Sequence, residues 1–329
     1  MDQLTAHLDR GWDLAQRGDA PGAEASARKA LELEAQSPEA HNLLGFAAAL
    51  RGDFDEAMEY YRQAIALDDT FLEAILNAAE LCIHPLGEYE EAIALCDDAL
   101  NLVESGDELT DTLLLKFDAL LGLGDKDAAL ATLRQIPKGP FENPGHAFLV
   151  GRAYFEMGEL EVAEELLLDA AKREPESPDP PYYLALILDQ RGDIAGATDA
   201  LLRSRHLDSL TPGPPFSLSR EAFLATTRKA ALSVTPRLRA SLDEREIYTA
   251  DLPGVEAIVE GADPRAPVLV DVLEDDGTVR VFVYQKNIER IAGSIDRLSE
   301  EIRDAIEREV AAALLGDDLT PPPEGSALN

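Results

Sequence analysis

The stretch Gly151–Pro175, GRAYFEMGELEVAEELLLDAAKREP, holds the short pattern that decides the fold of most of this chain. Its centre is a Gly, an acidic residue, three variable positions and an Ala. The pattern occurs six times at spacings of 34 to 37 residues, and a repeat of this length predicts a stack of helical hairpins. The instances are Gly18-Asp19 with Ala23, Gly52-Asp53 with Ala57, Gly87-Glu88 with Ala92, Gly124-Asp125 with Ala129, Gly158-Glu159 with Ala163, and Gly192-Asp193 with Ala197.

Each position of the pattern has a physical role in a hairpin. Gly adopts the left-handed backbone conformation that ends a helix, and the acid after it puts negative charge where the next helix begins. The Ala and a second small residue seven positions later let two helices approach closely, and a bulky side chain there costs roughly 1–3 kcal/mol. The second small residues are Ala30, Ala64, Ala99, Ala170 and Ser204.

The position between the two small residues completes a resemblance to the tetratricopeptide repeat, which has an apolar or aromatic residue there and a Pro at the end of the unit. Pro175 ends the fifth unit in register. The resemblance covers residues 1–210 and implies a mainly α solenoid of about six helical hairpins, with extra residues near His84-Pro85 and Lys138-Gly139-Pro140. The intermediate positions are Ala27, Tyr61, Cys96, Leu133, Leu167 and Leu201.

The resemblance also implies a concave groove, lined by the first helix of each unit, that binds an extended peptide or a helix. Asn amides pair with peptide groups in both directions, and rigid aromatic side chains bury much area at low entropy cost. The aromatic residues may instead pack between neighbouring repeats. Repeats that clamp a terminal carboxylate use several bases, whereas Arg152 is the only base at a groove position. The predicted partner-binding residues are Asn42, Phe46, Asn77, Leu81, Leu114, Phe148, Arg152, Phe155 and Tyr182.

The formal net charge of −35 restricts the class of partner. A negative field of this size opposes nucleic-acid phosphates and anionic lipid surfaces, so we expect a neutral or basic protein or peptide. The alternative is that the acids serve only solubility. The chain begins Met1-Asp2-Gln3-Leu4-Thr5, without an apolar run behind basic residues, which favours a cytoplasmic protein. The two cysteines, Cys82 and Cys96, are expected to be buried thiols.

A different domain is predicted after the linker at residues 211–215, because Thr211-Pro212-Gly213-Pro214-Pro215 breaks the helical pattern. We expect a helix over residues 219–232, a strand over 246–250, and two strands over 268–273 and 279–284 joined by a hairpin turn at 274–277. A last helix over residues 299–315 has Ser299 as its cap and an apolar stripe of Leu298, Ile302, Ile306, Val310 and Leu314. Residues 316–329 lack periodicity and are predicted to be a disordered tail.

The order of these elements over residues 216–315 resembles the minimal zincin-like metallopeptidase domain, a small α+β fold. The strings that carry the resemblance are Asp251-Leu252-Pro253, Asp263-Pro264, Val268-Leu269, Val281-Phe282-Val283-Tyr284, Asn287-Ile288-Glu289-Arg290 and Glu300-Glu301-Ile302-Arg303.

The residues that would bind the catalytic zinc are absent from this domain. In the register of the family, Arg308 and Ala312 replace the two His ligands of its last helix, and only the general base remains, as Glu309. Zinc peptidases need imidazole or thiolate ligands, and no His or Cys follows His206. We therefore expect no metal and no cofactor, and Glu309 is expected to be solvated or paired with a neighbouring Arg.

Three hypotheses follow. The leading one is a non-catalytic adaptor that binds a partner in the solenoid groove and uses the degenerate zincin-like module as a second binding surface. The alternative is a metal-dependent peptidase with oxygen ligands Asp271, Asp275 or Asp276 and with Glu309 as base. In the third, the C-terminal module only caps the last hairpin.

Metal analysis of the purified protein separates the first two hypotheses. The adaptor is expected to lose all zinc on dialysis, since its last helix lacks the imidazole ligands that hold this ion. Stoichiometric zinc that survives dialysis would identify the peptidase.

Overall fold

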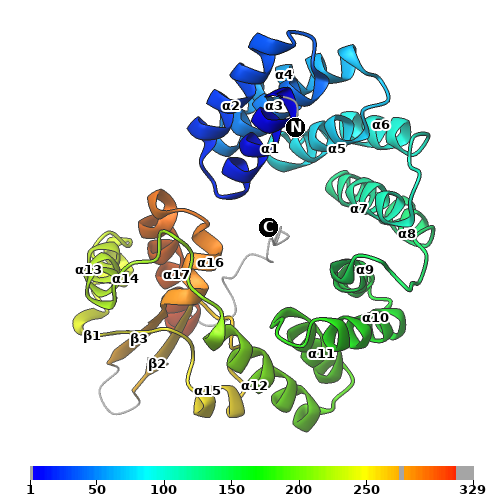
Figure 1. Cartoon of the computed structure of the whole chain (residues 1–329). Coiled ribbons are helices and arrows are strands. Elements are labelled where there is room, and N and C mark those ends of the chain that lie inside the picture. Colours follow the sequence, from blue (N-terminus) through cyan, green and yellow to red (C-terminus); the bar gives the residue numbers. More distant parts are fainter. Residues whose placement is uncertain (1–2, 274–277, 316–329) are drawn as a thin grey trace. The chain divides into compact units, whose positions relative to one another are not determined.

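The computed structural model of this protein describes residues 3–273 and 278–315, and it divides into two compact units, residues 1–175 and 176–329 (Figure 1). The predicted turn at residues 274–277 and the predicted tail at 316–329 lie outside the described residues.

The first unit consists of helical hairpins that follow one another along the chain, and each hairpin packs against the next. The first helices α3, α5, α7 and α9 lie on one side of this unit and the second helices α4, α6, α8 and α10 on the other (Figure 1). The hairpins pair α1 (Gln3–Gln16) with α2 (Ala20–Leu33), α3 (Pro38–Arg51) with α4 (Phe54–Leu67), α5 (Leu72–Leu81) with α6 (Tyr89–Ala99), α7 (Gly106–Gly122) with α8 (Lys126–Leu133), and α9 (Pro144–Glu156) with α10 (Leu160–Arg173).

The repeated Gly and acidic residues act as the pattern predicts. All six pattern glycines have left-handed φ angles between 69° and 82°. The acid after each Gly is the N-cap residue of the second helix. The carboxylates of Asp19, Asp125 and Asp193 accept a backbone N–H of the first turn, which satisfies a donor that the helix itself leaves free.

The repeated Ala residues form the contact between paired helices. All six pattern Ala residues are at most 4% exposed, and the second small residues are fully buried. At the same contact in the second hairpin, Gly45 packs against the ring of Tyr61, which is itself buried. Cys82 and Cys96 are buried thiols, as predicted, and burial raises the pKa of Cys96 to about 12.

The extra residues of the third and fourth units lie between the helices of unit three and after unit four. Residues Cys82–Leu86 form a π-helical turn that continues α5. A loop from residue 134 to 143 connects α8 with α9. The π-helical turn falls in the interval between Gly52 and Gly87, where the spacing of the pattern lengthens to 35 residues, whereas the loop lies between Gly124 and Gly158, which keep the spacing of 34.

The second unit contains the last repeat hairpin and a small α+β module. The three-stranded sheet has the order β1-β3-β2, with β1 parallel and β2 antiparallel to β3, so the predicted pairing of the last two strands is confirmed. The elements are α11 (Asp179–Gln190), α12 (Ile194–Leu210), α13 (Arg220–Ala231), α14 (Pro236–Arg239), β1 (Leu242–Ala250), α15 (Val255–Val259), β2 (Val268–Val272), β3 (Val279–Tyr284), α16 (Gln285–Ala292) and α17 (Ile295–Leu315).

Helices α13 and α17 cover one face of this sheet, and the core between them contains Phe223, Val281 and Ile302. The prediction for the last helix was wrong at the start of the helix and at the end of its apolar stripe. Helix α17 begins at Ile295, so Ser299 lies inside the helix and does not cap it, and Leu314 is exposed because the stripe extends past the sheet.

Side chains of α16, a helix that the periodicity did not predict, join the last hairpin to the module. The Lys286 ammonium donates to the backbone oxygens of Asp208, Ser209 and Thr211 at the end of α12, at 2.8, 3.3 and 2.5 Å. The Arg290 guanidinium pairs at 2.5 Å with the buried carboxylate of Asp208. A cation is favourable at a helix C-terminus, so these contacts stabilise the packing of α12 on α16.

The neighbouring side of α16 holds the segment that follows the Pro-rich linker. The buried Glu289 carboxylate accepts the Ser217 hydroxyl, the Leu218 backbone N–H and the Gln285 amide. A buried charge is stable only when its hydrogen bonds are satisfied, as they are here. The domain boundary predicted at residues 211–215 stays a prediction, and the packing groups the last hairpin with the module.

None of the helices within residues 3–273 and 278–315 joins the length to the apolar character that a membrane crossing needs.

The close helix contact predicts the effect of a single methyl group. In Gly45→Ala the new Cβ would lie 2.5 Å from Tyr61 Cε1 and 3.1 Å from the Ala57 carbonyl oxygen. We expect the free energy of unfolding, measured by urea denaturation, to fall by roughly 1–3 kcal/mol. Gly106→Ala is the control, because its Cβ meets nothing within 4 Å, and this variant should be as stable as wild type or slightly more stable. Equal stabilities of the two variants would contradict the close-packing account.

Candidate functional site

Two adjoining cavities lie along the first helices of the first unit. The large cavity has a volume of about 360 Å³ and lies among α5, α7 and α9. The small cavity has a volume of about 240 Å³ and lies among α3, α4 and α5. Both are lined by Asn77 and Glu80, so the two cavities adjoin at these residues. The large cavity is lined by Glu73, Leu76, Asn77, Glu80, Asp111, Leu114, Leu115, Asp118, Leu149, Arg152 and Ala153, and the small one by Phe46, Ala49, Leu50, Phe54, Tyr61, Asn77, Glu80, Leu81, His84 and Pro85.

The structure brings five of the nine predicted partner-binding residues into these linings. They are Phe46, Asn77, Leu81, Leu114 and Arg152.

The other four predicted residues lie elsewhere. Asn42 is fully buried, and Phe148 and Phe155 are half-buried on α9 outside the two linings. Tyr182 belongs to the second unit, where its hydroxyl donates to Asp263 at 3.0 Å. The partner-binding role of all nine residues stays a prediction.

An amide pair connects successive repeats below the cavities. The Asn77 amide donates to Asn42 Oδ1 at 2.9 Å, and Asn42 itself is fully buried. The pair therefore fixes the orientation of Asn77, which lines both cavities.

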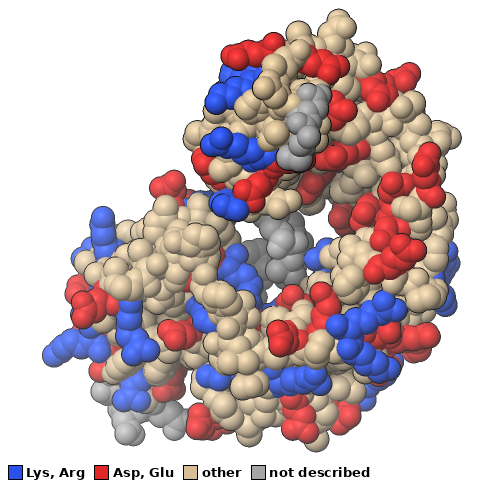
Figure 2. All heavy atoms as spheres, viewed as in Figure 1, with Lys and Arg blue, Asp and Glu red and all other residues tan. Residues whose placement is uncertain are grey.

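Negative charge dominates the large cavity. Glu73, Glu80, Asp111 and Asp118 line it, and Arg152 is the one base among the described residues of this lining. Figure 2 shows acidic side chains gathered over α7, the helix that supplies two of these carboxylates.

Burial of Asp118 is the strongest electrostatic perturbation in the cavity. Desolvation raises the pKa of Asp118 to about 6, and the positive charge of Arg152 opposes the rise. Desolvation also raises the pKa of Glu73, an effect that the Asn42 amide opposes, and raises the pKa of Glu156. Arg152 is itself within 3.4 Å of Glu156 and does not neutralise the cavity. A carboxylate held in such a place costs stability and is a candidate for function.

A buried histidine orients one of these carboxylates. His146 is 1% exposed at its side chain, and its ring nitrogens lie 3.1 Å from Asp107 Oδ1 and 2.8 Å from Asp111 Oδ1. The contact joins α9 to α7 and holds Asp111, which lines the large cavity.

Sequence reasoning missed Asp118, although the signal was present. Asp118 follows Leu81 by 37 residues and precedes Arg152 by 34, and the pattern glycines of these units have the same spacings. The repeat position that gives Leu81 and Arg152 therefore also gives Asp118. The prediction of the groove rested on aromatic and amide side chains, and Asp118 is neither.

The degenerate zinc motif forms an ion pair in the structure. Arg308 Nε lies 3.1 Å from Glu309 Oε1, so Glu309 is paired with a neighbouring Arg, which was the alternative to a solvated side chain, and Ala312 is half-buried on the same helix. Asp271 lies 4.0 Å from Arg280, whereas Asp275 and Asp276 fall outside the described residues. Among the residues that the structure describes, no three His, Cys, Asp or Glu side chains are grouped to bind a metal.

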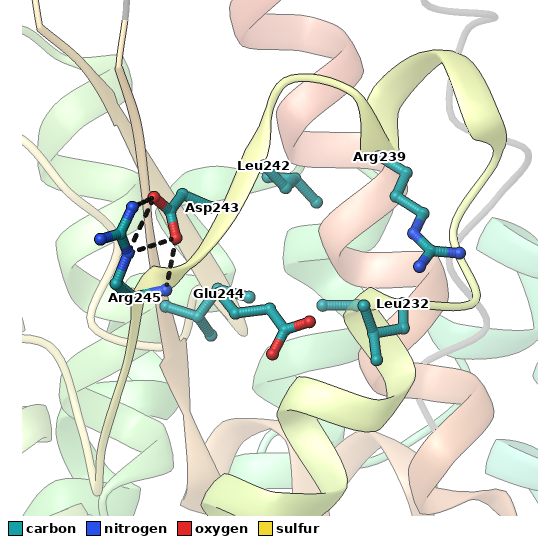
Figure 3. A pocket seen from close by; sticks show the side chains of 8 residues that line it. Leu232, Arg239, Leu242, Asp243, Glu244 and Arg245 are labelled. Atoms are coloured by element: carbon teal, nitrogen blue, oxygen red, sulfur yellow. Dashed lines mark hydrogen bonds and ion pairs between the residues drawn. The ribbon is translucent and has the colours of Figure 1, made fainter.

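The module has a hollow of about 570 Å³ beside the start of β1 (Figure 3). The register of β1 with β3 shifts between Leu242 and Ile247, and the charged residues of the hollow lie within this shift. Arg245 turns back onto Asp243 and donates to both of its oxygens, while Glu244 points away from that pair (Figure 3). The charges thus compensate one another, and the hollow lacks the desolvated charge of the large cavity.

Comparison with known proteins identifies the repeats. Three family profiles described as tetratricopeptide repeat match residues 4–29, 38–71 and 149–210. The chain therefore contains tetratricopeptide repeats, as the sequence pattern predicted.

Solved structures share the helical fold. The pilF protein of Pseudomonas aeruginosa is 20% identical with a TM-score of 0.53 over 64% of this chain and 93% of that chain. PilW, a type IV pilus biogenesis factor, is 18% identical with a TM-score of 0.53 over 66% and 96%. At these identities the likeness shows the fold alone.

A curated relative matches a short segment. Anaphase-promoting complex subunit 6 of Dictyostelium discoideum is 42% identical over 50 residues, which are 15% of this chain and only 6% of the length of that relative.

The raised pKa of Asp118 predicts a stabilising substitution. Between about pH 4 and pH 6 the folded protein binds the proton that the unfolded chain releases, so wild type loses stability as pH rises through this range. Asp118→Asn should therefore raise the free energy of unfolding at pH 7.5 by about 1–3 kcal/mol, and the gain should vanish near pH 4. Urea denaturation at both pH values measures the free energy of unfolding. The control Asp98→Asn, at an exposed position on α6, should change stability by less than about 0.5 kcal/mol. A destabilised Asp118→Asn protein at pH 7.5 would refute the desolvation account.

Proposed function

We propose that this chain is a cytoplasmic, non-catalytic adaptor that binds a peptide or helical segment of a partner protein along the two cavities of its first unit. The observation that carries the proposal is that the two cavities adjoin at Asn77 and Glu80 and lie along the first helices of successive repeats. Tetratricopeptide repeats mediate protein–protein interactions, and an extended depression over several repeats suits a linear segment.

The lining indicates how such a segment is recognised. Leu114, Leu115 and Leu149 supply apolar contact in the large cavity, and Phe46 supplies it in the small one. Asn77, held by Asn42, offers an amide to the backbone of the partner. Phe148 and Phe155, on the adjoining helix α9, extend the proposed surface.

The charge of the cavity selects the partner. Four carboxylates against one guanidinium favour a neutral or basic segment and disfavour nucleic acid and anionic membranes. The desolvated Asp118 supports the same choice, because a bound cation repays part of the cost of its burial.

We propose further that residues 216–315 are a zincin-like module without its metal, which serves as a second binding surface or as a cap. The helix, strand, hairpin and final helix follow in the order that the resemblance implies. The contacts of Lys286 and Arg290 with α12 support the capping role. Because Glu309 is engaged by Arg308, we prefer both roles to a peptidase that uses it as base.

A selection from random peptides displayed on phage tests the proposed groove. Peptides selected on wild type should lose at least tenfold in affinity, about 1.4 kcal/mol, for Leu114→Glu, which places charge in the apolar part of the large cavity. Isothermal titration measures the affinity, and circular dichroism checks the fold.

The matched control is Leu168→Glu, at a residue of α10 that is 45% exposed and lines neither cavity. It should bind like wild type. If Leu114→Glu and Leu168→Glu bind equally well, partners bind outside the proposed groove.

A further inference from the structure

The last hairpin repeats the groove positions of the fourth one and already holds a charged side chain. Asp179 and Tyr182 on α11 follow Asp111 and Leu114 on α7 by 68 residues, which is two repeat spacings of 34. Asp111 and Leu114 line the large cavity. The two helices therefore present the same repeat positions, one pair in each compact unit.

Arg265 of the module occupies these positions on α11. Its guanidinium carbon lies 4.2 Å from the centre of the Tyr182 ring, and its Nη2 donates to Asp179 Oδ1 at 2.6 Å. Its Nε lies 3.5 Å from the buried Asp208, and its side chain is only 16% exposed. A guanidinium is well suited to this place, because it is planar, permanently charged and weakly hydrated.

The contact is an internal example of recognition by a first helix of the repeats. A carboxylate at the first position binds the edge of the guanidinium, and a flat or apolar side chain three residues later covers its face. The fourth hairpin has the same carboxylate, with Leu114 in place of the ring, and its cavity holds about 360 Å³ of open space.

From this repetition, and resting on the proposed function, we infer that the large cavity binds an arginine side chain of the partner. The guanidinium pairs with Asp111, whose other oxygen His146 holds, and the methylene stem packs on Leu114. Asp118 adds negative potential close by. Charge-assisted hydrogen bonds to a carboxylate held in place are stronger than neutral ones. This contact should therefore contribute most to the selectivity of the cavity among peptide sequences.

Positional peptide libraries test the inference. Four libraries of random peptides share one fixed central residue, which is Arg, Lys, Gln or Glu. We expect the Arg library to bind wild type at least tenfold better than the Gln library, and the Lys library to fall between them because ammonium cannot bond in two directions within one plane. Fluorescence polarisation at pH 7.5 measures binding.

Substitutions locate the arginine site. Asp111→Asn and Asp118→Asn should each reduce the ratio of affinities for the Arg and Gln libraries by at least fivefold. Asp98→Asn, on the exposed side of α6, should leave the preference intact. Thermal melting verifies that each variant is folded.

The outcomes separate this inference from the proposed function. Peptides that lose binding in Leu114→Glu but show no preference for Arg would overturn the arginine site and leave the groove intact. Equal binding of the Arg and Lys libraries would also overturn it. If no library binds, or if Leu114→Glu binds as well as wild type, the proposed groove itself fails.

Discussion

The close approach of paired helices at small residues is the constraint on which the rest of the structure depends. Ala57, Ala92, Ala129 and Ala163 are fully buried at the contact between paired helices. Because these side chains are small, the two helices of each hairpin pack closely. That spacing fixes the tilt of each first helix relative to its neighbour. The alignment of Asn77, Leu114 and other groove positions in one depression is therefore a consequence of the size of a methyl group.

Charge and burial act against each other in this depression. The chain is strongly acidic, yet most of its carboxylates are solvated and contribute little to stability. Asp118 differs because it is desolvated in a cavity where Arg152, its closest source of positive charge, is shared with Glu156. The fold tolerates this cost because the surrounding hairpins supply a large apolar core. Local destabilisation is common at sites that bind a ligand.

The sequence predicted local features well and contacts between distant segments poorly. The Gly, acid and Ala pattern places all six turns, since each role depends on residues a few positions apart. Tyr182 was expected in the partner groove because the register alone cannot show that Arg265, 83 residues later, packs on it. Helix α16 was missed because its eight residues are mostly polar. Its buried polar residues Asn287 and Glu289 are held by hydrogen bonds, which periodicity does not detect. The start of α17 was misplaced because Ser299 followed by acids imitates a cap.

The attachment of α12 to Lys286 decides where the chain can be divided for biochemical work. A fragment that stops in the Pro-rich stretch would remove the ammonium group from three carbonyl oxygens and strip Asp208 of both its arginines. Such a truncation would leave an uncompensated anion inside the terminal repeat and solvent-exposed apolar area on α11. A cut before Glu176 avoids both defects, since it follows the natural division of packing. For recombinant production of the isolated array, the useful end point is therefore one hairpin earlier than the prolines suggest.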